Sequence, residues 1–154
     1  MTRVIALPSR IEDVYALAKT MRARDAEEAR IGFGADPKAL LRDCFKQSIL
    51  RQTYFVGDEI AAMVGMAGPL IGEIGYPYLI TSPAIARAPL AAVREARKAV
   101  ARMLQIREIL VAMAPADWPD SLRFLEMVGF IFDEPEPMGK NQMMFRRCTM
   151  QRAA

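Results

Sequence analysis

The stretch SLRFLEMVGF, Ser121 to Phe130, predicts a helix that ends at a glycine and leads directly into a strand. Its leucine and valine side chains recur at helical spacing, so they share one face of the helix. Gly129 can adopt the left-handed conformation that stops a helix, and Phe130 can pack back as the strand begins. Because capping and packing alone explain this helix exit, the surrounding elements must decide which fold it belongs to.

The segments on either side predict an α/β domain. The expected order is β-α-α-β-β-β-α-β-α-β-β, which is typical of a three-layer domain with a mixed sheet. We expect one domain over residues 1–154, with about four helices flanking the sheet, because this is a single-domain length. The expected strands lie at 3–8, 52–56, 60–67, 74–81, 107–114, 129–135 and 142–150, and the expected helices at 11–21, 37–50, 86–104 and 117–128.

Two irregular stretches qualify this scheme. The charged segment RARDAEEAR (residues 22–30) is expected to continue or fray the first helix, and the glycines that follow are expected to break it. The sequence GYP (residues 75–77) interrupts the strand at 74–81. Because Pro77 cannot donate to a strand ladder, we expect a bulge or an irregular opening there.

Composition excludes several classes of protein. A hydrophobic content of 53% with 25% charged residues excludes a disordered chain. The absence of histidine excludes Ser-His-Asp and Cys-His catalysis and histidine metal sites, so no metal is expected. Cys44 and Cys148 are expected to be small apolar residues in a reducing cytosol. Glycines and prolines break the most apolar stretch, residues 60–80, so no membrane span is expected.

The element order, together with the helix ending FLEMVGF, resembles the GNAT N-acetyltransferase superfamily. In that family the corresponding helix reads asparagine, a small residue, an aromatic pair and then Gly-Phe. Ser121 occupies the small position here, Phe124 the first aromatic position, and Gly129 with Phe130 the terminator. The resemblance spans nearly the whole chain in element order, and it implies a GNAT-like mixed sheet.

The cofactor turn departs from the family pattern. GNAT enzymes carry an Arg/Gln-x-x-Gly-x-Gly/Ala turn whose N–H groups close on the pyrophosphate of acetyl-CoA at a helix start. The corresponding stretch here, SPAIARAPLAAV (residues 82–93), contains no glycine, and Pro89 removes one N–H group. The helix start still carries a partial positive charge. The resemblance therefore implies these cofactor-binding candidates: Thr81, Ser82, Ala86, Arg87 and Ala88.

The catalytic positions depart as well. The asparagine of the family falls on or beside Trp118, and the tyrosine that protonates the departing thiolate falls on Leu125, which has no proton to give. Glu73 is a weak candidate for the base, although most carboxylates at strand ends are simply exposed to solvent. Tyr76 and Tyr78 are interpreted first as strand aromatics and second as acid candidates.

Three motifs narrow the resemblance to small proteins of tailed bacteriophages, grouped with the internal virion protein A family of podophages. These motifs are YLITSP, VREARKAVARML and SLRFLEMVGF. The resemblance implies a virion or virion-assembly protein that acts through protein binding in an oligomeric assembly, located in the virion or the host cytoplasm and not secreted. On this interpretation the acetyl-CoA site is degenerate and no cofactor is expected, which argues against an enzyme but leaves the question open.

Alternatives remain open at this stage. The chain can be an acetyl-CoA-dependent N-acetyltransferase with an unorthodox site, in which Glu73 is the base and the amides of residues 86–88 contact the phosphates. Binding of a host enzyme is neither supported nor contradicted. Nucleic acid also stays open as a partner, although the net charge of +3 is mild and the basic and acidic residues are interleaved.

Overall fold

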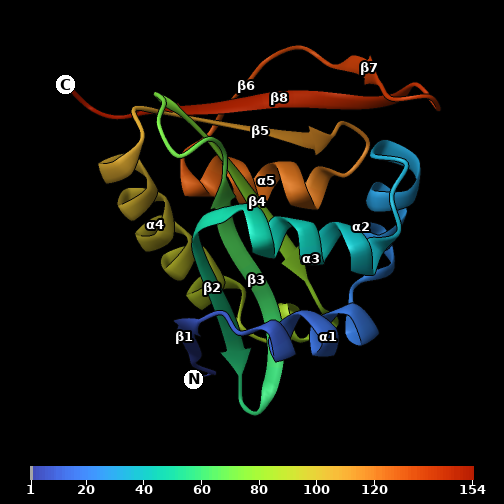
Figure 1. Cartoon of the computed structure of the whole chain (residues 1–154), viewed down its shortest axis with the longest axis vertical. Coiled ribbons are helices and arrows are strands. Elements are labelled where there is room, and N and C mark those ends of the chain that lie inside the picture. Colours follow the sequence, from blue (N-terminus) through green and yellow to red (C-terminus); the bar gives the residue numbers. More distant parts are fainter. Residues whose placement is uncertain (1) are drawn as a thin grey trace.

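A mixed, eight-stranded sheet lies at the centre of the molecule in the computed structural model, which describes residues 2–154 (Figure 1). The strand order is β1-β2-β3-β4-β5-β8-β6, and β7 also pairs with β8. All paired neighbours are antiparallel except β4 and β5. The strands are β1 (Val4–Pro8), β2 (Ser48–Val56), β3 (Glu59–Ala67), β4 (Ile74–Thr81), β5 (Ile109–Pro115), β6 (Ile131–Phe132), β7 (Glu136–Met138) and β8 (Met143–Gln151).

Helices cover both faces of this sheet. The helices are α1 (Ile11–Thr20), α2 (Ala23–Glu27), α3 (Pro37–Gln47), α4 (Pro89–Ile106) and α5 (Pro119–Val128), with a π-helical turn η1 (Glu28–Gly32) and a 3₁₀ helix η2 (Pro83–Arg87). Met63 of β3 packs in a buried cluster with α1 and α3, whereas its neighbours Ala62 and Val64 pack in the cluster of α4 and α5. Since successive strand residues point to opposite faces, the two helix pairs cover opposite faces. The predicted three-layer α/β fold is confirmed.

The helix exit at the end of α5 has the predicted form. Gly129 has a φ of +121°, and its N–H group donates to the carbonyls of Leu125 and Glu126. Phe130 donates to Leu125 at 3.0 Å and is buried in the cluster under α4 and α5. The glycine therefore ends the helix, and the phenylalanine fixes the direction in which the chain leaves it.

The two parallel strands separate soon after they meet. β4 pairs with β5 only at Ile74 and Gly75, whereas it stays paired with β3 from Tyr76 to Thr81. Pro77 comes two residues after Gly75, the last residue of β4 paired with β5, and its missing N–H group cannot continue that ladder. The predicted opening at GYP is confirmed, and it lies on the β5 side of the strand alone.

The segment that follows α1 differs from the prediction that it would continue or fray that helix. α1 ends at Thr20, Met21 is extended, and the Arg22 N–H group donates to the carbonyl of Thr81 at 2.9 Å. The bond to the end of β4 takes the chain out of the first helix, and α2 begins as a separate helix at Ala23. This extra helix brings the number of α-helices among residues 2–154 to five and places residues 22–32 beside the opening in the sheet.

Candidate active site

A cavity of about 620 Å³ lies where β4 and β5 separate. Its walls come from both strands, from the segment between α1 and α3 on one face, and from α4 and α5 on the other. The cavity therefore reaches both sides of the sheet through its opening. Its volume lies within the range of pockets that hold small ligands.

One wall of the cavity is an unpaired strand edge. At the end where β4 still pairs with β5, the carbonyl of Glu73 accepts from the Ile109 N–H group at 3.0 Å. At the other end of β4, the α2 segment binds the main chain of Thr81. The main-chain groups of every second residue of a strand point to the same side. Pro77 and Leu79 therefore face the opening, where Leu79 presents an N–H and a carbonyl group and Pro77 presents a carbonyl alone.

Asp25 of α2 closes the far end of this edge. Its carboxylate accepts from the Thr81 N–H group at 3.0 Å and from the Thr81 hydroxyl at 2.6 Å. The Arg22 guanidinium lies 3.5 Å from the same oxygen. Both residues are committed to holding α2 against β4, so Asp25 has a structural role.

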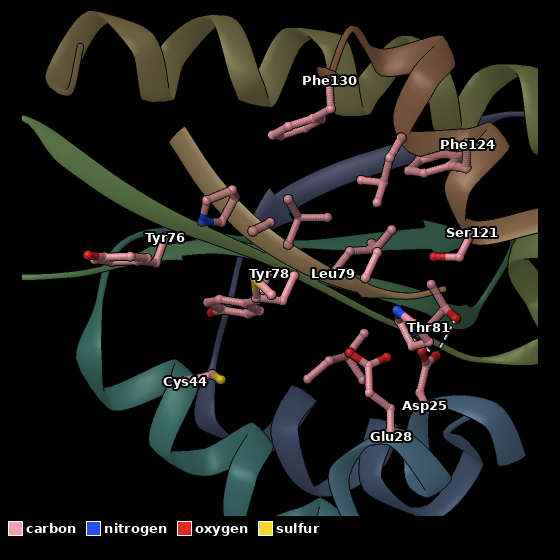
Figure 2. Close-up of a pocket in the computed structure, with 18 of the residues that line it drawn as sticks. Asp25, Glu28, Cys44, Tyr76, Tyr78, Leu79, Thr81, Ser121, Phe124 and Phe130 are labelled. Carbon is pink, nitrogen blue, oxygen red and sulfur yellow. Dashed lines mark hydrogen bonds between the residues drawn. The ribbon is translucent and has the colours of Figure 1, made fainter. Parts of the chain in front are cut away.

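Glu28 is different, because it lines the cavity without a partner. Its carboxylate forms no hydrogen bond or salt bridge with any other residue that the structure describes. The pKa of Glu28 is raised to about 7, mainly by burial and also by the charge of Asp25, while Arg24 offsets part of the increase. Figure 2 shows the Glu28 carboxylate pointing toward β4 into the cavity. A carboxylate with this pKa can accept a proton near neutral pH.

The α2 helix is also held from the opposite side of the opening. The Arg24 guanidinium pairs with Asp117, in the loop between β5 and α5. The guanidinium groups of Arg22 and Arg24 lie 4.5 Å and 5.5 Å from the centre of the Trp118 ring. The asparagine of the family falls at or beside Trp118. In this chain, Asp117 and Trp118 hold α2 in place, and α2 in turn positions Glu28.

Of the five predicted cofactor-binding residues, Thr81 is the one that lines the cavity. Ser82 is buried and caps the 3₁₀ helix, because its hydroxyl accepts from the Ala84 N–H group at 3.2 Å and donates to the carbonyl of Ile60 at 2.6 Å. Both residues therefore already have partners within the protein.

The other three predicted residues lie in the turn that follows. Arg87 forms a salt bridge of 3.2 Å with Glu59 in the β2–β3 hairpin. The Ala88 N–H group donates to the carbonyl of Ile85, and Ala86 is exposed. The turn is thus held by its own contacts, and its role in cofactor binding stays a prediction.

The residues predicted as acid or base candidates differ in whether they line the cavity. Glu73 is exposed just before β4 and lies outside the cavity lining, so the structure offers Glu28 as the better-placed carboxylate. Tyr76 and Tyr78 both line the cavity. The Tyr78 hydroxyl lies 2.6 Å from the Ser48 hydroxyl, and burial raises the pKa of Tyr78 to about 12, so it stays protonated. Leu125 lines the cavity where the family has its acid.

Both cysteines are free thiols. Burial raises the pKa of Cys44, which lines the cavity, to about 11, and that of Cys148 to about 12. Among residues 2–154, no group of three or more histidine, cysteine, aspartate or glutamate side chains is placed to hold a metal ion. No helix in the described part of the chain is long and apolar enough to cross a membrane.

Comparison with solved structures decides the fold. No protein-family model and no curated protein sequence matches the chain. The spermidine N-acetyltransferase of Vibrio cholerae in complex with CoA and spermine superposes with a TM-score of 0.70 at 10% identity, over 97% of this chain and 95% of that chain. An acetyltransferase (GNAT family) of Bacillus anthracis gives 0.69 at 10% identity, with coverage of 97% and 95%. A putative acetyltransferase of Salmonella typhimurium with its cofactor acetyl-CoA gives 0.67 at 12% identity, with coverage of 98% and 96%.

The chain has the GNAT fold. The comparison corrects two expectations, namely that the chain is a virion protein with a degenerate site and that it takes no cofactor. Structures of this fold that resemble the chain are acetyltransferases, some with CoA or acetyl-CoA bound, which favours the alternative interpretation. A missing glycine turn and a missing tyrosine do not by themselves remove the site, because the protein keeps an open cavity whose lining includes the carboxylate of Glu28.

The narrower resemblance to internal virion proteins of podophages is not shown by the comparisons, and neither is a virion location. The expected virion partners, an oligomeric assembly and nucleic-acid binding stay predictions.

Proposed function

We propose that the protein is an acetyl-CoA-dependent N-acetyltransferase in which Glu28 is the general base. One observation carries this proposal: the Glu28 carboxylate, with a pKa of about 7 and no partner, points into the cavity at the unpaired edge of β4. A general base is most effective when its pKa lies near the working pH.

The residues of the cavity fit the acyl end of the cofactor. A buried main-chain N–H or carbonyl group is costly unless it is hydrogen-bonded, and Leu79 presents both on the open edge of β4. The amide groups of an extended pantetheine chain can satisfy them in the way that a neighbouring strand would. Acetyl-CoA, when bound, supplies the acetyl group as a thioester.

For the phosphate groups of acetyl-CoA, the first turn of α4 is a simpler candidate binding site than the turn predicted from the sequence. No side chain caps the start of α4, and Pro89 occupies the first helical position, where an N–H group has no helical partner in any case. The N–H groups of Leu90 and Ala91 in this first turn can bind an anion, because they lie at the positive end of the helix dipole.

Glu28 performs the proton chemistry in this proposal. Its carboxylate takes one proton from the acceptor ammonium, which leaves a neutral amine able to form the new C–N bond as the C–S bond breaks. The second proton of the nitrogen passes through solvent to the thiolate sulfur, and Glu28 returns its own proton to solvent. Thiols have pKa values of about 8.5, so a thiolate can leave without a dedicated acid. Leucine at position 125 is therefore compatible with turnover.

The test combines binding with turnover. Calorimetric titration with acetyl-CoA should give binding in the micromolar range, and incubation with acetyl-CoA and a panel of primary amines should release free thiol in proportion to acetylated amine. If acetyl-CoA does not bind at millimolar concentration, the proposed function is wrong. If it binds but no amine in the panel is acetylated, the assignment as a transferase fails.

A further inference from the structure

The part of the cavity that faces α1 and α3 is walled mainly by apolar and aromatic side chains. Those side chains are Met21, Ala29, Phe33, Leu40, Tyr76 and Ile80. Phe33 and Tyr76 are about half exposed, with 48% and 47% of their surface accessible, so they lie where the cavity meets solvent. Figure 2 shows Tyr76 at the opposite end of the β4 wall from Thr81. A ligand that enters here meets aromatic surface first and Glu28 further in.

Five charged residues line the cavity, and two of them, Arg22 and Asp25, are used to hold α2 against β4. Asp25 is already bound to Thr81 and lies beside the Arg22 guanidinium. Glu136 and Arg147 also line the cavity, but they are exposed, carry opposite charges, and belong to strands β7 and β8. Glu28 is thus the partly buried acid that is left to meet a cation, and no second partner-free acid accompanies it on the described part of the wall that faces α1 and α3.

We propose that the acceptor is a primary amine that carries a single positive charge on an apolar or aromatic stem. This inference rests on the proposed function and names its substrate class. Glu28 binds the ammonium group, and the apolar walls take the stem out of water, which is favourable in proportion to the apolar area buried. A second ammonium group would lose its hydration against those walls without gaining a carboxylate. The acceptor therefore differs from a polyamine such as the spermine bound by the Vibrio cholerae neighbour.

The direct experiment compares 2-phenylethylamine with spermidine at saturating acetyl-CoA. The expected result is a kcat/KM for 2-phenylethylamine that is at least tenfold higher than that for spermidine. Equal values, or a preference for spermidine, would overturn the substrate assignment while leaving the transferase assignment intact. Failure to bind acetyl-CoA, or to acetylate any amine, would instead count against the proposed function itself.

A substitution that adds a negative charge tests the same inference, because it should shift the preference from 2-phenylethylamine toward spermidine. Tyr76→Glu adds a second carboxylate where the cavity meets solvent, so kcat/KM for spermidine should rise about fivefold or more and that for 2-phenylethylamine should fall. Tyr15→Glu is the matched control, because Tyr15 lies on α1 with a similar exposure of 44% and outside the cavity lining. If both variants shift the preference equally, the effect comes from net charge and the inference is wrong. If Tyr76→Glu leaves the preference unchanged, the stem does not pass this wall.

Discussion

The turn between β4 and α4 and the segment between α1 and α3 each carry polar residues beside the opening in the sheet, but they use them differently. In the turn, Ser82 caps the 3₁₀ helix and Arg87 pairs with Glu59, so these side chains have partners within the protein. In the other segment, Asp25 is bound to Thr81, whereas the Glu28 carboxylate is left without a partner in the described structure.

The comparison separates residues that build the site from residues that can act in it. A polar side chain with satisfied partners has already lowered its own free energy by making them, so it has little to gain from a ligand. A buried carboxylate without a partner keeps a raised pKa and gains most when a cation arrives. On this criterion we expect Glu28 to be the functional group and the turn at 82–89 to be mainly structural.

The largest effect is expected from Glu28→Gln, which removes the base and keeps the shape of the side chain. At pH 8, kcat/KM for the preferred amine should fall by roughly 100-fold or more, as is typical when a general base is lost. The affinity for acetyl-CoA should stay the same, and steady-state kinetics together with calorimetry measure both quantities.

Glu27→Gln is the matched control for that variant. Glu27 is the last residue of α2, next to Glu28 in the chain; its side chain is half exposed and pairs with Arg24 at 3.3 Å. If both variants lose activity to a similar degree, Glu28 acts only through the integrity of α2, and the contrast between the two regions disappears.

The same Glu28→Gln substitution should stabilise the protein in a pH-dependent way. Because the folded-state pKa of Glu28 is raised from 4.5 to about 7, the folded protein holds a proton that the unfolded chain has lost between these values. The free energy of unfolding of the wild type should therefore fall as the pH rises through this window. Glutamine removes the effect, so the variant should be more stable by about 2–3 kcal/mol at pH 8 and nearly equal at pH 4. Urea unfolding at the two pH values measures this, and an equal gain at both would contradict the assigned pKa.

A smaller effect is expected from filling the cavity on the side of α5. Ser121 is half-buried and lines the cavity beside Phe124 (Figure 2), so Ser121→Trp should raise the Kd for acetyl-CoA by roughly tenfold, or about 1.4 kcal/mol. Arg123→Trp places the same bulk on the exposed face of α5 and should leave the Kd unchanged. Calorimetric titration compares the two variants, and equal affinities would show that acetyl-CoA binds elsewhere.

The smallest effect is expected in the turn. Arg87 and Glu59 are both more than half exposed, so Arg87→Ala should lower the free energy of unfolding by less than about 1 kcal/mol. The Kd for acetyl-CoA should change by less than about threefold, which is under 1 kcal/mol. A loss of tenfold or more would return Arg87 to the role of a phosphate ligand and remove the difference between the two regions.

The fold was accessible from the sequence because its decisive signals are local. Gly129 ends α5 by its own conformation, and Pro77 prevents a strand ladder by its missing N–H group, whatever surrounds either residue. The periodic apolar residues of the helices add to these signals, so most of the element order could be predicted, although the separate helix α2 and the short strand β7 were missed.

The site was less accessible because it depends on contacts between distant residues. Asp25 and Glu28 are three residues apart, which places them on one side of a helix, but the sequence alone describes an exposed charged segment. Glu28 lies partly buried beside the cavity because Arg22 and Asp25 hold its segment to Thr81, more than 50 residues along the chain. For the same reason, the salt bridge between Arg87 and Glu59 could not be predicted from the turn itself.

The central claim is that Glu28 accepts the proton of the acceptor amine, and the pH dependence of kcat/KM for acetylation of 2-phenylethylamine tests it most directly. The amine itself titrates far above neutrality, with a pKa of about 10 as for other alkyl amines. The wild type should therefore show a limb with an apparent pKa near 7, below which the rate falls tenfold per pH unit, and Glu28→Gln should lose that limb. A wild-type profile without a limb near pH 7, or the same limb in Glu28→Gln, would contradict the account.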